Sequence, residues 1–214
     1  MNNVNLKTSM LDSFKQQDPD LYEKIIQFKR IFNFDEVLGD RYSISFLLDT
    51  FFAFKNDLIN ISAVLDELKY LEGIGPQTHT KSASQFNRNQ LKGLWHKHYS
   101  DGNIPELAQN VRNALRNYSI PYLDEQIRGF ETSGETRYIT EKDVSLIVDD
   151  LVSGNLARRR AEQKMTGEWL VYASHEGQNY YLCLAKHNDG YGSIRNKIDS
   201  TGVHEFPFLK EILS

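Results

Sequence analysis

Large apolar residues recur at helical spacing through the first part of the chain. Over residues 21–32 they stand four, three and four positions apart, which places them on one face of a helix. Asp18 followed by Pro19 is typical of a helix N-terminus, because aspartate caps the first turn and proline fits into it. Similar stripes predict helices over residues 43–55 and 62–72. One-sided helices need apolar partners, so a helical bundle is expected.

A loop interrupts this pattern, and helical signals return after it. The glycines and the proline of residues 73–76 predict the loop, and apolar residues at helical spacing resume from Pro105. Thr140 and Asp143 stand three positions apart ahead of an apolar stripe, which is typical of a helix capping box. A short basic helix over residues 156–165 is expected to follow.

The apolar period changes from helical to two near the C-terminus. Residues 167–175 and 179–187 are rich in β-branched, aromatic and aliphatic side chains, which favours two strands. Gly177-Gln178 between them suits a two-residue hairpin turn with glycine first. Both faces of this hairpin are apolar, so it is expected to pack on helices or on a further strand.

The predicted turn sets a pairing for the hairpin. It pairs Val171 with Leu184, and it places His187 opposite Glu168 at the open end. His175 lies beside the turn, roughly 23 Å from His187 at ~3.3 Å per residue. The two histidines are therefore not expected to act as a pair, and His187 is the better candidate for a site.

These elements predict an α+β protein. Its body is a mostly helical bundle over about residues 10–165, followed by a small C-terminal antiparallel β-hairpin module. The expected division is an N-terminal helical region over 1–80, a basic central helical region over 81–165 and the hairpin module over 166–214. The alternative joins 81–214 as one domain.

Composition narrows the class of protein. The 214 residues are 40% apolar and 25% charged, as is usual for a globular protein that buries a core. Cys183 is the only cysteine, which excludes an internal disulfide and favours a reducing compartment. The first residues lack the profile of a secretory signal, and no apolar run is long enough to cross a bilayer. A cytoplasmic location without membrane association is expected.

Charge is distributed in blocks along the chain. The net charge is −4, yet residues 81–118 carry six basic against two acidic side chains, and residues 151–164 carry four against one. Residues 1–80 and 119–150 are acidic. The basic blocks suit a polyanion such as RNA. The alternative is that acidic and basic blocks pair with each other in the fold.

The segment 91–99 carries the densest candidate chemistry. His96 and His98 are candidate acid–base catalysts, because imidazoles exchange protons near neutral pH. Lys92 and Lys97 are candidates for binding phosphate, and Trp95 for stacking on a base. In the alternative interpretation Trp95 is a core anchor and the polar residues form a solvated edge. No carboxylate or cysteine completes a metal site with the two histidines, so no metal or cofactor is expected.

Three arginines outside this segment complete the candidate site. Arg158 and Arg159 belong to a run of three arginines that must fan around a helix, which leaves at least one for phosphate. Pairing of this run with Asp149 and Asp150 is the alternative. The turn after His187 brings Arg195 towards that histidine. Arg195 is a candidate for binding substrate, and His187 is a candidate catalytic residue.

Two functions of different class fit these candidates. The first is metal-independent cleavage of RNA by histidine, lysine and arginine side chains, as in a growth-inhibiting toxin. The second is a non-catalytic protein-binding module, such as an immunity, antitoxin or regulatory factor, acting through its acidic surface. A nucleic-acid-binding regulator would need the two basic blocks to form one stripe.

Overall fold

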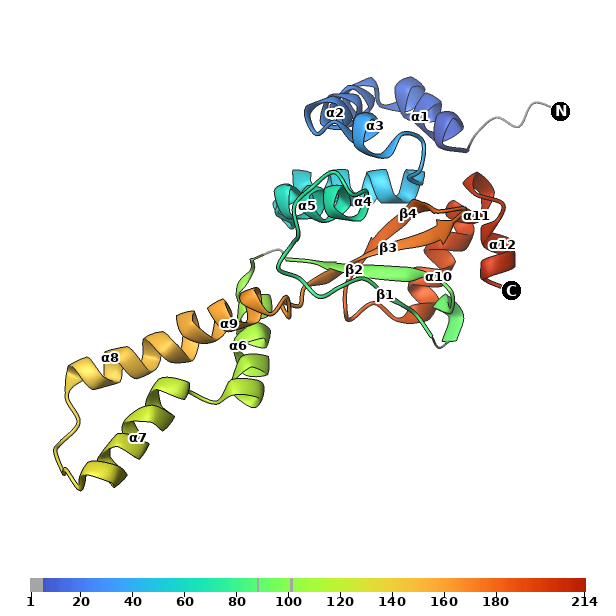
Figure 1. Ribbon diagram of the computed structural model, residues 1–214. Coiled ribbons are helices and arrows are strands. Elements are labelled where there is room, and N and C mark those ends of the chain that lie inside the picture. The colour runs from blue at the N-terminus through green and yellow to red at the C-terminus, as the bar shows by residue number, and fades with distance from the viewer. Residues whose placement is uncertain (1–5, 88, 101) are drawn as a thin grey trace. The chain divides into compact units, whose positions relative to one another are not determined.

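The computed structural model describes residues 6–87, 89–100 and 102–214, so the first residues, in which no secretory signal is seen, lie outside it (Figure 1). Contacts divide the chain into two compact units. The sheet unit comprises the described residues of 1–78, 82–101 and 167–214, and the helical unit comprises residues 79–81 and 102–166. Whether the ranges 1–80, 81–165 and 166–214 fold as separate domains stays a prediction.

Five helices begin the sheet unit, namely α1 (Leu6–Gln17), α2 (Pro19–Ile31), α3 (Phe34–Leu38), α4 (Ile44–Lys55) and α5 (Ile61–Leu71). Two of these helices have N-terminal caps formed by residues three positions apart in the sequence. Asp18 accepts a hydrogen bond from the Leu21 amide at 3.0 Å, which confirms the predicted start of α2. Ser43 Oγ accepts one from the Phe46 amide at 3.0 Å at the start of α4.

A four-stranded antiparallel sheet follows in the order β1 (Ser84–Gln85), β2 (Trp95–Tyr99), β3 (Glu168–His175) and β4 (Gln178–Ala185). A short 3-10 turn, η1 (Asn89–Leu91), connects β1 to β2. The α+β class is therefore confirmed. The sheet is wider than a hairpin, because β1 and β2 come from the central region of the sequence and β2 pairs with β3.

The predicted register of the C-terminal hairpin is wrong. The turn residues are Glu176 and Gly177, whose φ angles are 50° and 75°. Two successive positive φ angles give a turn whose twist matches that of the strands, with glycine second rather than first. His175 consequently pairs with Gln178, which the sequence analysis had placed in the turn.

A β-bulge between Val171 and Tyr172 shifts the register again. It pairs Val171 with Cys183, not with Leu184 as the sequence analysis expected.

Apolar side chains cover both faces of this sheet. Helices α4 and α5 pack on one face, over buried residues such as Phe46, Leu68 and Tyr181, and α2 packs on α4. Helices α10 (Tyr191–Ser200), α11 (Gly202–Glu205) and α12 (Leu209–Ile212) cover the other, over residues such as Leu182. Figure 1 shows the sheet between these two layers. The expected packing of the hairpin on helices and on a further strand is thus confirmed.

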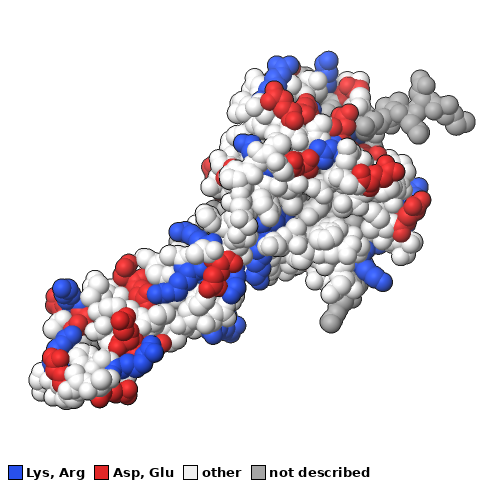
Figure 2. Space-filling model, in the orientation of Figure 1, with Lys and Arg blue, Asp and Glu red and all other residues white. Residues whose placement is uncertain are grey.

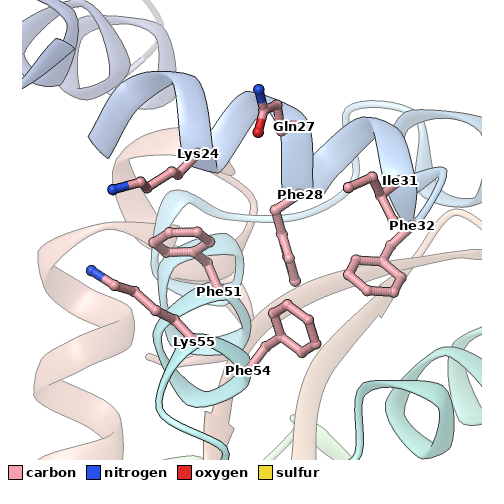
Figure 3. A pocket seen from close by; sticks show the side chains of 8 residues that line it. All are labelled: Lys24, Gln27, Phe28, Ile31, Phe32, Phe51, Phe54 and Lys55. Carbon is pink, nitrogen blue, oxygen red and sulfur yellow. The ribbon is translucent and has the colours of Figure 1, made fainter. Parts of the chain in front are cut away.

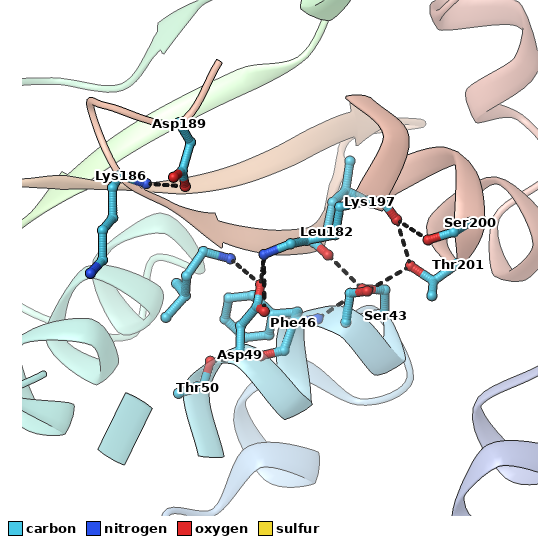
Figure 4. Close-up of polar contacts among 12 residues, drawn as sticks. Ser43, Phe46, Asp49, Thr50, Leu182, Lys186, Asp189, Lys197, Ser200 and Thr201 are labelled. Carbon is cyan, nitrogen blue, oxygen red and sulfur yellow. Dashed lines mark hydrogen bonds and ion pairs between the residues drawn. The ribbon is translucent and has the colours of Figure 1, made fainter. Parts of the chain in front are cut away.

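A partly buried polar network ties the two layers to β4. Asp49 on α4 accepts hydrogen bonds from the Lys197 ammonium group at 3.0 Å and from the Leu184 amide at 3.1 Å (Figure 4). Burial raises the pKa of Asp49, although Lys197 opposes this shift. Ser43 donates to the Leu182 carbonyl at 2.6 Å. These contacts fix α4 and α10 against the same strand.

The helical unit contains α6 (Ile104–Tyr118), α7 (Pro121–Ser133), α8 (Glu141–Asp149), a π-helical segment (Asp150–Gly154) and α9 (Asn155–Ala161). The predicted capping box is confirmed, since Thr140 and Asp143 bond each other's backbone amides. No helix among the described residues is long and apolar enough to cross a membrane.

Candidate functional site

Strand β2 carries two of the predicted catalytic residues. His96 and His98 alternate along the strand, so both rings lie on the same face of the sheet. The pairing of β2 with β3 sets Trp169 opposite His98. The centroids of the His96 and Trp169 rings lie 5.2 Å apart, and Phe86 packs on His96 at 4.5 Å. The segment that carries the two histidines is therefore a strand of the sheet.

The third predicted histidine joins them from the end of β4. The His187 ring stacks on His98 with centroids 5.3 Å apart, and the His98 ring lies 5.7 Å from His96. His187 also contacts Trp169 at 4.6 Å. We name His96, His98 and His187 the imidazole cluster. Its members are separated by up to 91 residues in the sequence and come from β2 and from the turn that follows β4.

The buried member of the imidazole cluster is fixed by a backbone contact. His98 is 6% exposed, and its Nδ1 atom lies 2.7 Å from the Gly167 carbonyl oxygen. The Gly167 amide lies farther from the same nitrogen, at 3.3 Å. The shorter contact favours a proton on Nδ1, which leaves Nε2 as the basic nitrogen of the neutral ring. His96 Nε2 lies 3.1 Å from the Ser84 hydroxyl.

A carboxylate orients the most exposed member. Glu168 accepts a hydrogen bond from the His187 amide at 2.7 Å, and the same oxygen lies 3.6 Å from Nδ1 of the ring. The His187 side chain is 48% exposed, so it can meet a ligand from solvent. Its placement near Glu168 follows the expectation from the sequence, although the register between them differs.

Two predicted substrate-binding residues lie on the opposite face of β2. Lys97 is 1% exposed and pairs with Glu67 at 3.2 Å, and burial lowers its pKa. Trp95 packs into the core beside Tyr172, with ring centroids 6.4 Å apart. The alternation that brings the histidines together necessarily directs these side chains away from them. We therefore leave Lys97 and Trp95 out of the site.

The two remaining predicted substrate-binding residues of the sheet unit, Arg195 and Lys92, differ in how far their side chains are engaged in contacts within the protein. Arg195 binds Asp199 through Nε at 2.9 Å, and its Nη1 donates to the carbonyl oxygens of Gln90 and Leu213. Its guanidinium group thus ties α10 to neighbouring turns. Lys92 is exposed and follows η1 directly.

The two predicted arginines of the helical unit have separate environments. Arg158 pairs with Asp150 at 2.5 Å, as the alternative interpretation of the arginine run expected. Arg159 is 2% exposed and has no carboxylate partner among the described residues. The two arginines are adjacent in the sequence, but the tertiary contacts of α9 pair Arg158 with a carboxylate and bury Arg159.

Sequence reasoning missed the aromatic surroundings of the imidazole cluster. Trp169, Phe86 and Tyr191 pack around the rings, and Glu168 orients one of them. The alternation of Trp169 with Val171 along β3 indicated that Trp169 shares a face with Val171. It could not show that His96 and His98 lie beside that face, because their strand is about 70 residues earlier in the sequence. Within the described residues, no group of three or more histidine, cysteine or acidic side chains is arranged to hold a metal ion.

A second surface feature lies between helices α2 and α4. The α2–α4 groove has a volume of about 360 Å³ and an apolar floor of phenylalanines (Figure 3). Its lining residues are Lys24, Gln27, Phe28, Ile31, Phe32, Phe51, Phe54 and Lys55. Ile31 is 71% exposed, and neither lysine forms an ion pair with a described residue. The groove is thus an apolar surface bordered by two cations.

No protein-family model, curated protein or solved structure matches this chain.

Proposed function

We propose that this protein cleaves RNA by acid–base catalysis at the imidazole cluster, without a metal ion, and that it acts in the cytoplasm as a growth-inhibiting toxin. The observation that carries the proposal is the close approach of three imidazoles that are far apart in the sequence. Paired imidazoles supply both a base and an acid near neutral pH. His187 is exposed, whereas His96 is half-buried with its Nδ1 atom enclosed, so substrate would reach His96 through Nε2, beside the Ser84 hydroxyl.

The reaction is a transfer within the RNA strand. One neutral imidazole removes the proton of a ribose 2′-hydroxyl, and that oxygen attacks the adjacent phosphorus. The bond from phosphorus to the 5′-oxygen breaks, and a protonated imidazole donates its proton to the leaving oxygen. The products are a 2′,3′-cyclic phosphate and a free 5′-hydroxyl. Glu168 positions His187 for this step, because one of its carboxylate oxygens accepts the hydrogen bond of the His187 amide and lies 3.6 Å from Nδ1 of the ring.

Aromatic side chains support the same proposal. Trp169 contacts the rings of both His96 and His187, and Tyr191 lies 6.4 Å from Trp169. Aromatic rings beside catalytic groups stack on unpaired bases, which favours single-stranded RNA as the substrate. Lys97 cannot contribute the cation that the sequence analysis assigned to it, since it is buried on the other face. The protonated imidazole supplies positive charge in its place.

The direct experiment is cleavage of a labelled single-stranded RNA by purified protein in EDTA. We expect products that end in a 2′,3′-cyclic phosphate and a bell-shaped dependence of the rate on pH. His187→Ala and His96→Ala should each lower the rate by about a hundredfold or more, because each removes one proton carrier.

His204→Ala is the matched control, since His204 is an exposed histidine of α11 that contacts none of the three rings. It should cleave at the rate of the unaltered protein. Intact RNA, or equal cleavage by His187→Ala and the unaltered protein, would remove the proposal.

The α2–α4 groove favours a second candidate function, the binding of a partner protein. The sequence favoured such binding through acidic surface, whereas this groove is bordered by Lys24 and Lys55. We propose an amphipathic helix as the occupant, with apolar anchors for the floor and acidic residues facing the two lysines.

A synthetic leucine-striped helix tests this candidate, made once with flanking glutamates and once with flanking lysines. The acidic version should bind more tightly, and Ile31→Asp should weaken its binding. Leu58→Asp is the control, because Leu58 is 57% exposed but lies outside the groove. Equal binding of the two helices would contradict the assignment of the partner.

A further inference from the structure

A polar concavity in the helical unit gathers four cationic side chains. It has a volume of about 310 Å³ and lies between α6, α9 and the residues that flank them. We name it the basic concavity. Its lining residues are Lys81, Asn113, Arg116, Asn117, Arg159 and Lys164. Four of the six are basic, and no acidic side chain of the described residues lines the concavity.

Arg159 is the unusual member of this set. Its Nε donates to the Asn110 side-chain oxygen at 3.2 Å, and its Nη2 donates to the Lys164 carbonyl. Both acceptors are neutral, and no described carboxylate lies within ion-pair distance of the guanidinium group. Burial of a charged group without an opposite charge is costly, and here it lowers the pKa of Arg159. An anion in the concavity would offset that cost.

The residues around Arg159 suit an oxyanion. Arg116 is exposed and forms no ion pair with a described residue. Asn113 and Asn117 lie on the same helix, α6, and also line the concavity. Two side-chain amides are therefore in the same wall as this guanidinium group. Lys164 pairs with Glu162, which also accepts a hydrogen bond from Tyr118. The carboxylate of Glu162 is therefore already engaged by two donors.

We propose that the basic concavity binds a phosphate group. Arginine's planar fork matches phosphate oxygens, and neutral amides add hydrogen bonds without adding repulsion. The volume admits a phosphate with part of the molecule that carries it. On the face that Figure 2 shows, basic side chains gather over α6 and α9, whereas basic and acidic ones alternate over α7 and α8.

This inference is independent of RNA cleavage. It concerns residues of the helical unit alone, and it holds whether or not the imidazole cluster is catalytic. The phosphate has two potential sources, a free phosphate ion and the backbone of a nucleic acid. The chemistry that recognises them in the concavity is the same.

Calorimetric titration of the full-length protein tests the proposal with two probes. The first is inorganic phosphate, and the second is an eight-nucleotide 2′-O-methyl RNA, which lacks the hydroxyl needed for cleavage. We expect Arg116→Ala to weaken binding by about tenfold or more, the loss typical of a hydrogen bond to a charged group. Arg159→Lys keeps the charge but loses the fork, so it should also weaken binding.

Arg112→Ala is the matched control, because Arg112 is an exposed arginine of the same helix that lies outside the concavity. It should bind each probe within twofold of the unaltered protein. Binding of inorganic phosphate that Arg116→Ala weakens supports a site for the free ion. Binding of the RNA alone, with the same sensitivity and a reduced dependence on salt, supports a site for a backbone phosphate.

Failure of both probes to bind would overturn the proposal. Binding that Arg116→Ala leaves unchanged would also overturn it. Arg116 is exposed, so its variant tests the site even if Arg159→Lys does not fold. Neither outcome depends on cleavage, and loss of cleavage in His187→Ala would leave the phosphate site unaffected.

Discussion

The sheet unit and the helical unit bury different kinds of side chain. In the sheet unit, aromatic and aliphatic residues are fully buried on both faces of a sheet, Phe46 and Tyr181 on one face and Leu182 on the other. In the helical unit, the buried apolar residues among those described are Ala114, Leu156 and Met165. The buried polar residues of the same unit are Thr80, Asn110, Asn155 and Arg159. One unit is held by apolar packing and the other largely by hydrogen bonds.

The difference extends to the surface. Many large apolar side chains of the helical unit are exposed, and they are Ile104, Leu107, Leu115, Ile127, Tyr138, Ile139, Val144, Leu146 and Val148. Since apolar burial is the main favourable term in folding, the helical unit has the smaller share of it. Its helices depend instead on caps and on polar contacts such as Asp150 with Arg158. Local opening should therefore begin in the helical unit.

The largest expected effect comes from the apolar core of the sheet unit. Phe46 is fully buried between Phe34 and Tyr181, so Phe46→Ala leaves a cavity. We expect a loss of about 3–5 kcal/mol in the free energy of unfolding, the usual cost of removing a buried phenyl group. Urea denaturation followed by tryptophan fluorescence measures it. A loss below about 1 kcal/mol would show that apolar packing at Phe46 does not stabilise the sheet unit.

The second prediction tests the polar core of the helical unit. Asn110 accepts hydrogen bonds from Arg159 and from the Thr166 amide, and it donates to the Thr166 carbonyl. Asn110→Ala leaves a buried guanidinium nitrogen and an amide without acceptors, which should cost about 2–4 kcal/mol locally. Hydrogen exchange measured on peptides of α6 and α9 should accelerate.

Peptides of the sheet strands should keep their exchange rates in the same variant. Asn117→Ala is the control, because Asn117 is an exposed asparagine of the same helix. If Asn110→Ala changed no exchange rate in the helical unit, the polar network would not be what stabilises it.

The third prediction concerns the effect of alkaline pH on the buried tyrosines of the sheet unit. Burial raises the pKa of Tyr172 from 10.0 to about 12, and it also raises the pKa values of Tyr42 and Tyr181. The unfolded chain ionises first, so the stability present below pH 10 is lost as the pH rises towards 12. For Tyr172 the loss is roughly 2–3 kcal/mol. The three tyrosines of the helical unit are half-buried or exposed.

Absorbance at 295 nm during a pH titration measures this difference. Some tyrosines should ionise only when the sheet unit unfolds, as judged by circular dichroism at the same pH. Ionisation of all tyrosines in one step near pH 10, with the fold intact, would contradict the burial of these three rings.

The smallest expected effect is on the surface of the helical unit. Val148 is 50% exposed on α8, so Val148→Ser should change the free energy of unfolding by no more than about 0.5 kcal/mol. Val64→Ser in α5 is the matched comparison, because Val64 is fully buried and the change adds both a cavity and a buried hydroxyl. Equal losses for the two variants would show that Val148 is covered in solution.

Several features of the fold could be predicted because they are local. The caps at Asp18 and Thr140 depend on residues three positions apart, and the structure has both. Apolar spacing identified the helices that became α2, α4 and α5 within one or two residues. The turn of the hairpin was displaced by one residue, because positive φ at Glu176 is not visible in its type.

The candidate site was predictable only in part. Histidines at alternate positions of a strand must share a face, so the proximity of His96 and His98 follows from local geometry once β2 is a strand. The approach of His187 depends on two long-range pairings, of β2 with β3 and of β3 with β4. Lys97 shares the segment with the histidines, yet its burial beside Glu67 could not be inferred from its neighbours.

The sequence by itself determined the helices, their caps, the α+β class and the residue types available for chemistry. The tertiary structure alone decided the four-stranded register, the buried state of Arg159 and the meeting of three imidazoles. The physical reason is range. Hydrogen bonds within a turn or a helix are set by residues a few positions apart, whereas strand pairing and burial depend on segments that only folding brings together.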